Sequence, residues 1–254
     1  MRIPDLDALF AEMSSPEDDV RYSVAWIDLV AKGSALGRSV LGRGDHATLA
    51  QLGPKEAANP LRYDARQLVA VPPLVPPSGV LNHATVAAFN EVWFRKAPAH
   101  RVGELQSITT FFHPLDGVAD WNRIYGAGGL IQYQIVVPDG HEDTIRTCIE
   151  AFSSAGAASF LAVLKRFGPH NPGPLSFPMS GWTLALDLPA GIDGLAATLD
   201  LLDQEVIAAG GRLYLAKDSR TTGEIIAAGY PQLDEFRAVK AAVDPTNLFR
   251  SDQS

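Results

Sequence analysis

The sequence has 254 residues, of which 46% are hydrophobic and 20% are charged, so the chain can bury a sizeable core and is too apolar for a disordered protein. Its 21 Lys and Arg residues are scattered singly among 29 Asp and Glu residues, and the net charge of −8 argues against nucleic-acid binding. Cys148 is the only cysteine, which excludes an intramolecular disulfide and a cysteine-based zinc site.

The N-terminus does not have the apolar run of a signal peptide, because Arg2, Asp5 and Asp7 interrupt it. No later segment reaches the ~18 consecutive apolar residues that a membrane-spanning helix needs. We therefore predict neither a signal peptide nor a transmembrane helix and expect a cytoplasmic protein, with contact to a membrane surface left open.

Hydrophobic periodicity predicts the first elements. Apolar residues recur at spacings of three and four over residues 3–13, which predicts a short amphipathic helix that stops at 14–16. The β-branched and aromatic run 22–30 predicts a strand. Residues 31–66 show no clear period, so we expect irregular backbone there.

Residues 69–80 contain four prolines between Pro72 and Pro77. Because proline cannot donate to a β-ladder, this segment is predicted to be extended loop. Its other side chains are apolar, which leaves two interpretations open: a loop that covers a core, or a surface that meets a lipid or a partner.

The rest of the chain alternates between periodic and β-branched segments. We predict helices at 85–94, 142–155, 195–209, 222–228 and 233–242, and strands at 129–137, 158–165, 182–188 and 212–216. This order predicts an α+β fold with a mostly antiparallel sheet flanked by helices.

Several common catalytic motifs are absent from the sequence, namely the phosphate-loop lysine motif, G-x-S-x-G, H-E-x-x-H and a G-x-G-x-x-G that follows a strand. The six histidines are dispersed without ligand spacing. We therefore predict no metal site.

Polar residues within the predicted strands are the remaining candidates. Gln132 and Gln134 share one strand face, where they either present two amides to sugar hydroxyls or simply face solvent. Lys165 and Lys217 each end an apolar strand, where a lysine either extends into solvent or points into a pocket. The run 214–220 adds an aspartate, a serine and an arginine at that second strand end.

Eight segments form a pattern that is more specific than any of these residues alone. They are Phe111–Asp116, Trp121–Gly126, Gln132–Gln134, Lys165–Pro169, Pro174–Pro178, Gly181–Trp182, Gly210–Arg220 and Val243–Pro245. In this order they resemble the decaprenylphosphoryl-β-D-ribose 2′-oxidases, which are FAD-dependent flavoproteins of the vanillyl-alcohol oxidase superfamily.

The resemblance implies an oxidoreductase in cell-wall arabinan synthesis. Such enzymes oxidise the 2′-hydroxyl of a polyprenyl-phosphate ribose by hydride transfer to FAD, which is the first half of an epimerisation. A short-chain dehydrogenase-type reductase is the expected partner for the second half. The implied localisation is cytoplasmic or peripheral at the plasma membrane.

The resemblance also implies roles for individual residues. Lys217 is expected to be catalytic, beside flavin and substrate, with Tyr214 near the flavin. The implied substrate-binding positions are Gln132, Gln134 and Lys165 around the sugar phosphate, with Trp26 and Phe167 at an apolar margin. Segments 67–83 and 114–128 correspond to mobile loops over the pocket mouth.

Three further pocket positions depart from the family pattern. Phe112 replaces a tyrosine, Thr183 replaces an asparagine, and Ala185 replaces the cysteine that covalent inhibitors attack. We therefore expect the pocket to bind substrate without that reactive thiol.

The resemblance implies two parts: a substrate-binding cap over residues 1–210, and a C-terminal segment of the FAD lobe over residues 211–254. The N-terminal FAD lobe is expected to lie outside this sequence, either because the chain is a fragment or because a separate chain supplies the lobe. We therefore expect the chain alone to bind FAD weakly. Two alternatives stay open: a related FAD-linked sugar or aldonolactone oxidase, and a non-catalytic cap that binds a lipid-linked sugar or a partner protein.

Overall fold

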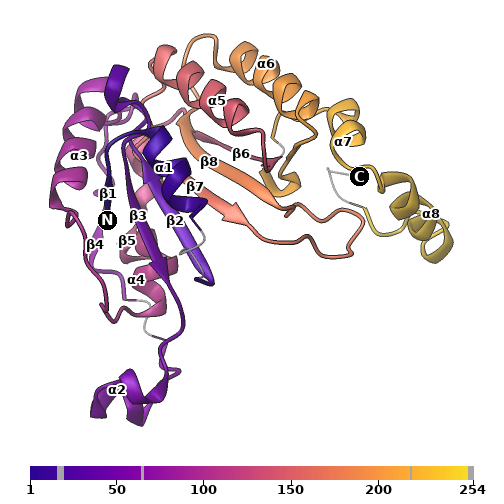
Figure 1. Ribbon diagram of the computed structural model, residues 1–254. Coiled ribbons are helices and arrows are strands. Elements are labelled where there is room, and N and C mark those ends of the chain that lie inside the picture. Colours follow the sequence, from indigo (N-terminus) through magenta and orange to yellow (C-terminus); the bar gives the residue numbers. More distant parts are fainter. Residues whose placement is uncertain (16–19, 64–65, 218, 251–254) are drawn as a thin grey trace.

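The computed structural model describes residues 1–15, 20–63, 66–217 and 219–250. Pro16, Asp218 and residues 251–254, which belong to segments discussed above, lie outside the described residues. Within the described part, seven strands form one antiparallel sheet in the order β1-β3-β2-β7-β8-β6-β9, with helices against it (Figure 1). The predicted α+β fold with an antiparallel sheet is thus confirmed.

The strands of this sheet differ greatly in length. They are β1 (Arg2–Ile3), β2 (Tyr22–Ile27), β3 (Ser39–Gly44), β6 (Leu130–Pro138), β7 (Ala162–Phe167), β8 (Gly181–Pro189) and β9 (Arg212–Leu213). The central pair β6 and β8 is matched over nine residues, from Leu130 opposite Pro189 to Pro138 opposite Gly181.

The helices are distributed unequally around the sheet. They are α1 (Leu6–Met13), α2 (Pro54–Ala58), α3 (His83–Lys96), α4 (Ile108–Phe112), α5 (Glu142–Ser154), α6 (Leu195–Ala208), α7 (Gly223–Gly229) and α8 (Leu233–Val243). The apolar faces of α1, α5 and α6 join the inward strand residues in one buried core. Helix α2 lies at the end of an arm that extends away from the sheet (Figure 1).

Period-two alternation explains which sheet face is buried. In β6, Tyr133 and Ile135 are buried in the core, whereas Gln132 and Gln134 lie on the opposite face, as predicted. Among the core helices, α1 is also fixed at its start, since the Asp5 side chain caps its first turn by accepting from the Ala8 N–H at 2.8 Å.

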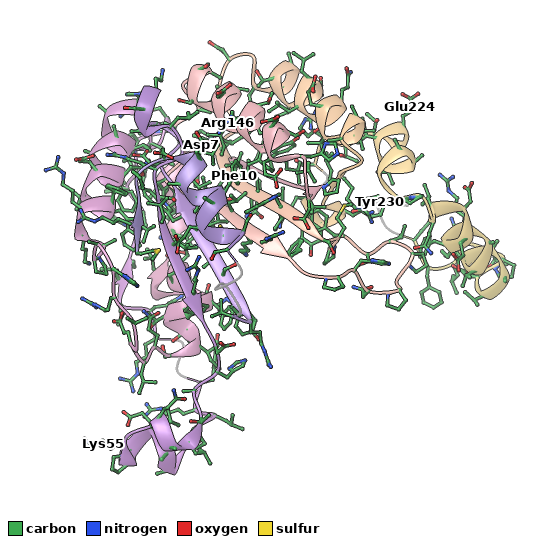
Figure 2. All side chains as sticks on the ribbon, in the orientation of Figure 1. Asp7, Phe10, Lys55, Arg146, Glu224 and Tyr230 are labelled. Atoms are coloured by element: carbon green, nitrogen blue, oxygen red, sulfur yellow. The ribbon has the colours of Figure 1, made fainter. Side chains whose placement is uncertain are left out.

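Helix α1 is joined to the rest of the core by an ion pair and an aromatic contact, and Figure 2 labels three of the residues involved, Asp7, Phe10 and Arg146. Asp7 of α1 pairs with Arg146 of α5, and the Phe10 ring meets the fully buried Trp182 ring edge-on at 5.0 Å. The Trp182 indole N–H in turn donates to Glu142 at the start of α5, at 2.8 Å. Helices α1 and α5 and strand β8 therefore share one set of hydrogen-bonded and aromatic contacts in the core.

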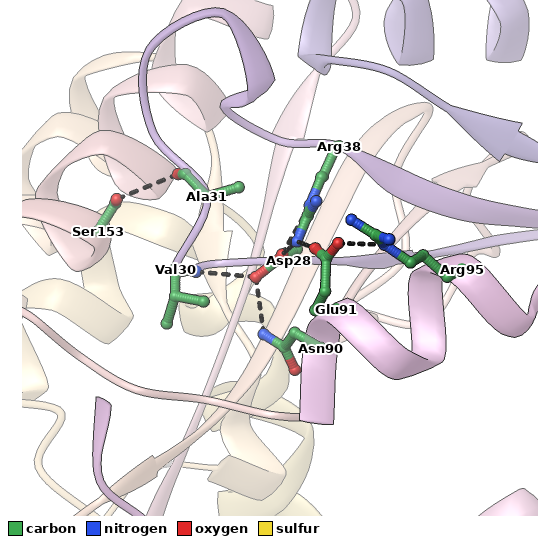
Figure 3. Close-up of polar contacts among 8 residues, drawn as sticks. All are labelled: Asp28, Val30, Ala31, Arg38, Asn90, Glu91, Arg95 and Ser153. Atoms are coloured by element: carbon green, nitrogen blue, oxygen red, sulfur yellow. Dashed lines mark hydrogen bonds and ion pairs between the residues drawn. The ribbon is translucent and has the colours of Figure 1, made fainter. Parts of the chain in front are cut away.

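Helix α3 is anchored to the sheet by a buried carboxylate, Asp28, which directly follows β2 (Figure 3). Asp28 Oδ1 accepts from the Val30 N–H at 3.1 Å and from the Asn90 amide at 2.7 Å, and Oδ2 pairs with Arg38 at 2.6 Å. Arg38 also reaches Glu91 of α3 at 2.7 Å. These contacts join β2, β3 and α3 at one end of the sheet.

Three expectations about the strands are wrong. Irregular backbone was expected over 31–66, but β3 pairs with β2 along six residues. The strand was missed because Gly42 and Gly44 interrupt the alternation of side chains, although they do not prevent pairing. The strand expected over 158–165 is β7, shifted toward the C-terminus. The strand expected over 212–216 stops after Leu213, because the Lys217 N–H donates to the Tyr214 carbonyl and forms a 3-10 turn.

The proline-rich segment is extended, as predicted, but it does not bury its apolar side chains in a core. Leu68, Val69 and Leu74 are 81%, 63% and 94% exposed. The interpretation as a core cover is therefore wrong for these residues, and the segment presents them at the surface instead.

The C-terminal residues differ in how closely they join the sheet. Tyr230, at the end of α7, is buried and donates through its hydroxyl to the Leu213 carbonyl of β9 at 2.6 Å. Helix α8 has no buried residue and exposes Phe236, Val239 and Val243. The division at residue 210 stays a prediction, and β9, Tyr214 and Tyr230 are hydrogen-bonded to the sheet.

Candidate functional site

The sheet face opposite the core helices carries most of the predicted site residues. One cross-strand row on this face runs from Gln134 on β6 through Ala185 on β8 and Val163 on β7 to Trp26 on β2. With neighbouring strands about 4.8 Å apart, the row spans about 14 Å. Antiparallel pairing therefore gathers residues that are more than a hundred positions apart in sequence.

A cavity of about 2500 Å³ lies over the β2 and β7 side of this face. Its lining includes the predicted site residues Trp26, Phe112 and Lys165, together with α3 and the arm that carries α2. The Trp26 indole N–H is fixed by donating to the Phe160 carbonyl at 2.8 Å, so its ring forms a rigid wall. This volume exceeds the ~300–1,000 Å³ of most small-molecule pockets and fits a long ligand.

Lys165 lies at the edge of that cavity, opposite Thr183 in the β7–β8 register. Its side chain as a whole is exposed, yet partial burial of the ammonium group lowers the pKa of Lys165 below its ordinary value. A lysine in this position lies close to both water and an apolar wall, which suits an anionic group at the cavity mouth.

The two glutamines lie beside the cavity on the central strands. The Gln134 amide donates to the Thr183 hydroxyl at 3.4 Å, and Gln132 lies directly opposite Asp187. Both glutamines are half-buried, so the interpretation as a freely solvated face does not hold. Their amides, with the Thr183 hydroxyl, form a polar strip that suits sugar hydroxyls.

Tyr214 and Phe167 are brought together by a residue that the sequence analysis did not single out, Phe177. The Phe177 ring stacks on Tyr214 at 4.5 Å and meets Phe167 edge-on at 5.9 Å. The signal was present in the Pro174–Pro178 segment, but its role depends on the long loop between β7 and β8 returning to β9.

Lys217 ends the 3-10 helix η5 (Leu215–Lys217), which follows β9. The Tyr214 N–H donates to the Gln134 carbonyl at 2.9 Å, so the segment stays attached to β6 beyond the last strand residue. Lys217 is half-buried. Burial raises the pKa of Asp187, and Gln132 and the charge of Lys217 act in the opposite direction. Asp187 was missed, although an aspartate within a seven-residue apolar strand was the available signal.

Arg220 fixes the C-terminal end of the run 214–220, which carries Lys217. It donates to the buried Asp203 of α6 at 2.6 Å and also pairs with Asp200, while Tyr133 donates to the other Asp203 oxygen at 2.9 Å. Burial raises the pKa of Asp203, and the Arg220 and Tyr133 hydrogen bonds oppose that shift. Arg220, which belongs to the run at 214–220, therefore acts as an anchor for the segment that carries Lys217.

Phe112 lies apart from the glutamines. It is on α4, its ring meets the Tyr22 ring edge-on at 4.9 Å, and it is 40% exposed. The structure thus places Phe112 on the cavity wall, beside Tyr22 at the start of β2.

The two segments expected to be mobile loops are bound to each other. Strand β4 (Val69–Ala70) pairs in parallel with β5 (Val118–Ala119), and the Ala127 N–H donates to the Pro77 carbonyl at 2.9 Å. We call residues 67–83 and 114–128 together the cover. Its two halves behave as one unit because backbone hydrogen bonds join them at several points.

Substituting Gly126 with alanine is expected to separate the two halves of the cover. Gly126 has a φ of 71°, and an added Cβ would lie 2.3 Å from the Gly79 nitrogen and 2.4 Å from the Pro77 oxygen. Limited proteolysis should cut residues 67–83 several times faster in Gly126→Ala than in the wild type. Gly128→Ala is the matched control, since its Cβ would meet nothing within 4 Å. Equal cleavage in all three proteins would show that the pairing does not hold the cover.

Other chemistries receive no support from the described residues. Among them, no group of three or more His, Cys, Asp or Glu side chains is arranged to hold a metal ion. None of the helices in the described ranges is long and apolar enough to cross a bilayer. Cys148 is buried in the core, and this burial raises the pKa of its thiol to about 12, so it is not a reactive nucleophile.

Comparisons with known proteins support the resemblance noted from the sequence. The chain is 40% identical over 260 residues to a Streptomyces coelicolor protein named "Uncharacterized protein in mprA 5'region", with 99% of this chain and 69% of that protein covered. The chain belongs to the same family as this Streptomyces protein. No family model matches it.

A second relative has a name that matches the predicted chemistry. The decaprenylphosphoryl-beta-D-ribose oxidase of Mycolicibacterium smegmatis is 42% identical to the chain over 238 residues, which is 94% of the chain. The match covers 51% of that oxidase, so the chain spans about half its length. The relationship to this oxidase is therefore shown over one part of it, and its activity is not transferred by the comparison alone.

Proposed function

We propose that this chain is the substrate-binding part of an FAD-dependent oxidoreductase that oxidises the 2′-hydroxyl of a polyprenyl-phosphate ribose. The observation that carries the proposal is the polar strip of Gln132, Gln134 and Thr183, which lies between Lys165 at the cavity edge and Lys217 at the end of η5. Amides suit the ribose hydroxyls, and the cavity has room for the apolar tail.

The two lysines have separate tasks in this proposal. Lys165, at the cavity mouth, binds the substrate phosphate as a compact cation. Lys217 stabilises the negative charge that develops on the 2′-oxygen as its proton leaves. Trp26, held by its bond to the Phe160 carbonyl, and Phe167, which meets the Phe177 ring, supply apolar walls.

The residues at the end of β9 fit one edge of a flavin. Tyr214 offers an aromatic face and Lys217 a hydrogen-bond donor, which together match an isoalloxazine ring with a polar edge. Bound FAD would supply the hydride acceptor. Since the chain spans about half of the M. smegmatis oxidase, FAD binding to this chain alone is expected to be weak, and visible flavin absorbance of the purified chain measures it.

The proposal includes three partners, two of which are assigned to exposed surfaces of the chain. The exposed apolar residues of α8 suit contact with a flavin lobe, supplied by the same polypeptide or by another chain. The exposed apolar residues of the cover suit a peripheral contact with the membrane that holds the substrate. A keto-sugar product requires a reductase to complete the epimerisation, and a short-chain dehydrogenase-type enzyme has that chemistry.

Binding of a short-chain polyprenylphosphoryl ribose to the purified chain tests the proposal, and it is followed by the intrinsic tryptophan fluorescence to which Trp26 in the cavity wall contributes. We expect this ligand to bind at least about tenfold more tightly than either polyprenyl phosphate or ribose 5-phosphate, since each half fills only part of the site. Lys165→Met should weaken binding about tenfold, the effect of losing one charge-assisted contact. Lys32→Met, an exposed lysine outside the cavity lining, is the matched control.

The outcomes separate the competing functions. Ribose 5-phosphate binding as tightly as the full ligand would favour an oxidase with a soluble sugar substrate. Binding of the full ligand by a flavin-loaded protein that never reduces its flavin would indicate a non-catalytic binding module. No binding of any of the three ligands would overturn the proposal.

A further inference from the structure

The loop between β7 and β8, residues 168–180, is attached to the sheet face that carries the two glutamines. Arg212 of β9 pairs with Val136 of β6, and because the next residue, Leu213, points into the core, Arg212 points to the opposite face. There its guanidinium Nη1 donates to the Ser176 carbonyl of the loop at 2.8 Å. The loop therefore covers the site face at its β9 end, whereas the cavity lies at the β2 and β7 end.

Phe177 follows the anchored Ser176 and places its ring against two others. It is 6% exposed, and its ring stacks on Tyr214 with 4.5 Å between centroids and 28° between planes. The Phe167 ring meets it edge-on at 5.9 Å. Stacked and edge-on contacts at these distances are the geometries that aromatic rings prefer. The Phe177 ring is therefore fixed by its surroundings, and it restricts the Tyr214 ring in turn.

Hydrogen bonds fix the backbone of Tyr214 but not its ring. The Tyr214 N–H donates to the Gln134 carbonyl at 2.9 Å, and the Tyr214 carbonyl accepts from the Lys217 N–H at 2.8 Å. Neither bond restricts rotation about the side-chain torsions of this tyrosine, which is only half-buried. The contact with Phe177 supplies this restriction.

Arg212, which attaches the loop, is itself held on a rigid base. Its guanidinium carbon lies 5.3 Å from the centre of the buried Tyr230 ring, whose hydroxyl donates to the Leu213 carbonyl at 2.6 Å. Arg212 Nε is buried, and no atom of the described residues accepts a hydrogen bond from it. A buried donor without an acceptor is unfavourable for the fold, so a reason for keeping an arginine there is needed.

We propose that Phe177 is a positioning residue for Tyr214: its ring holds the tyrosine ring in one orientation at the end of the polar strip, and Arg212 keeps Phe177 in place through the Ser176 carbonyl. The four contacts that carry this inference run from Tyr230 through Arg212 and the loop to Tyr214. The inference rests on the proposed function only in treating Tyr214 as a flavin contact.

The order of the Tyr214 ring is the first test, because a residue that only fills space would leave it unchanged. The chain has six tyrosines, so a spectrum with ¹³C-labelled tyrosine rings is simple, and the Tyr214 signal is assigned from its loss in Tyr214→Phe. We expect the ring order parameter of Tyr214 to fall clearly in Phe177→Leu, which keeps apolar bulk but has no flat ring. Phe236→Leu, the same change at an exposed position of α8, is the matched control and should leave it unchanged. An unchanged order parameter in a folded Phe177→Leu protein would overturn the proposal.

The loop attachment is tested by Arg212→Met, which keeps an unbranched apolar side chain and removes the donor to Ser176. The order parameter of the Tyr214 ring should fall in this variant too, and it should stay unchanged in Arg237→Met, an exposed arginine of α8. This variant retains Phe177, so it also tests the proposal if Phe177→Leu does not fold. A Tyr214 ring as ordered as in the wild type would contradict the role of Arg212.

Steady-state kinetics of the flavin-loaded enzyme that contains this chain give the functional consequence. Because Tyr214 is assigned to flavin, Phe177→Leu should lower kcat by about tenfold or more, the effect of a small misplacement, with KM within about twofold of wild type. A loss confined to KM would make Phe177 part of the substrate site and overturn the positioning role. The ring measurements use neither flavin nor substrate, so they can fail while the ligand-binding test succeeds, and the reverse also holds.

Discussion

Lys217→Ala is expected to lower turnover of the flavin-loaded enzyme that contains this chain by about 10²-fold or more, the usual loss when a positioned electrostatic group is removed. The reason is that the ammonium group stabilises charge on the substrate oxygen in the transition state. Lys217 is anchored for this task by η5 and by the nearby contact of Arg220 with Asp203.

Steady-state turnover of Lys217→Ala, Lys217→Arg and Lys32→Ala makes this test specific. The arginine variant should not restore turnover, because a guanidinium is bulkier and has a different donor geometry. Lys32→Ala should behave as wild type, because this lysine is exposed and lies outside the cavity lining. Circular dichroism and melting temperature should be the same for all four proteins. The prediction is contradicted if Lys217→Ala turns over within about threefold of wild type while Gln132→Ala no longer binds substrate. That result would mean that the site is organised around the strand that carries the glutamines.

Asp28→Ala is expected to reduce the free energy of unfolding by about 3–5 kcal/mol, which is the cost of removing one partner of a buried ion pair. The substitution removes the acceptor of the Asn90 amide and of the Val30 N–H, and it leaves Arg38 with Glu91 alone. Asn90 is fully buried, so water cannot replace the lost carboxylate there (Figure 3).

Urea unfolding of Asp28→Ala and Asp28→Asn measures this loss. The asparagine variant keeps an oxygen for the Val30 N–H and should lose less stability than the alanine variant. Asp193→Ala is the exposed control and should stay within about 0.5 kcal/mol of wild type. A loss below about 1 kcal/mol for Asp28→Ala would mean that the pair behaves like a solvated surface ion pair.

The candidate site lies between the end of the sheet that the Asp28 contacts fix and the cover, whose two halves are paired. Asp28, Arg38 and Asn90 hold α3 against one end of the sheet, where α3 forms part of the cavity wall. The cover holds its own halves together through β4 and β5. A long ligand would therefore enter between a rigid wall that includes α3 and the cover, which moves as one unit.

Much of the fold was determined by local sequence. The helices near 142–155 and 195–209 and the strands near 129–137 and 182–188 were predicted because amphipathic periodicity is a local property. The face shared by Gln132 and Gln134 followed from period-two geometry alone. The site residues at Lys165 and Lys217 came from the resemblance together with their position at strand ends.

Other features depended on the tertiary structure. β3 contains Gly42 and Gly44 and is a strand only because β2 provides its hydrogen-bond partners. Lys217 was predicted to follow a strand, whereas η5 forms because the Tyr214 N–H bonds to Gln134 and the Lys217 N–H turns back to Tyr214.

The sequence by itself determined the α+β class, the core helices and the strand that carries the two glutamines, because each rests on the spacing of neighbouring side chains. Only the tertiary structure decided which distant residues share the site. Asp187 becomes the neighbour of Gln132 through strand register, and Phe177 stacks on Tyr214 because the loop between β7 and β8 returns to β9. The burial of the Asp187 carboxylate is a property of the packed molecule, whereas the sequence shows only an aspartate within an otherwise apolar strand.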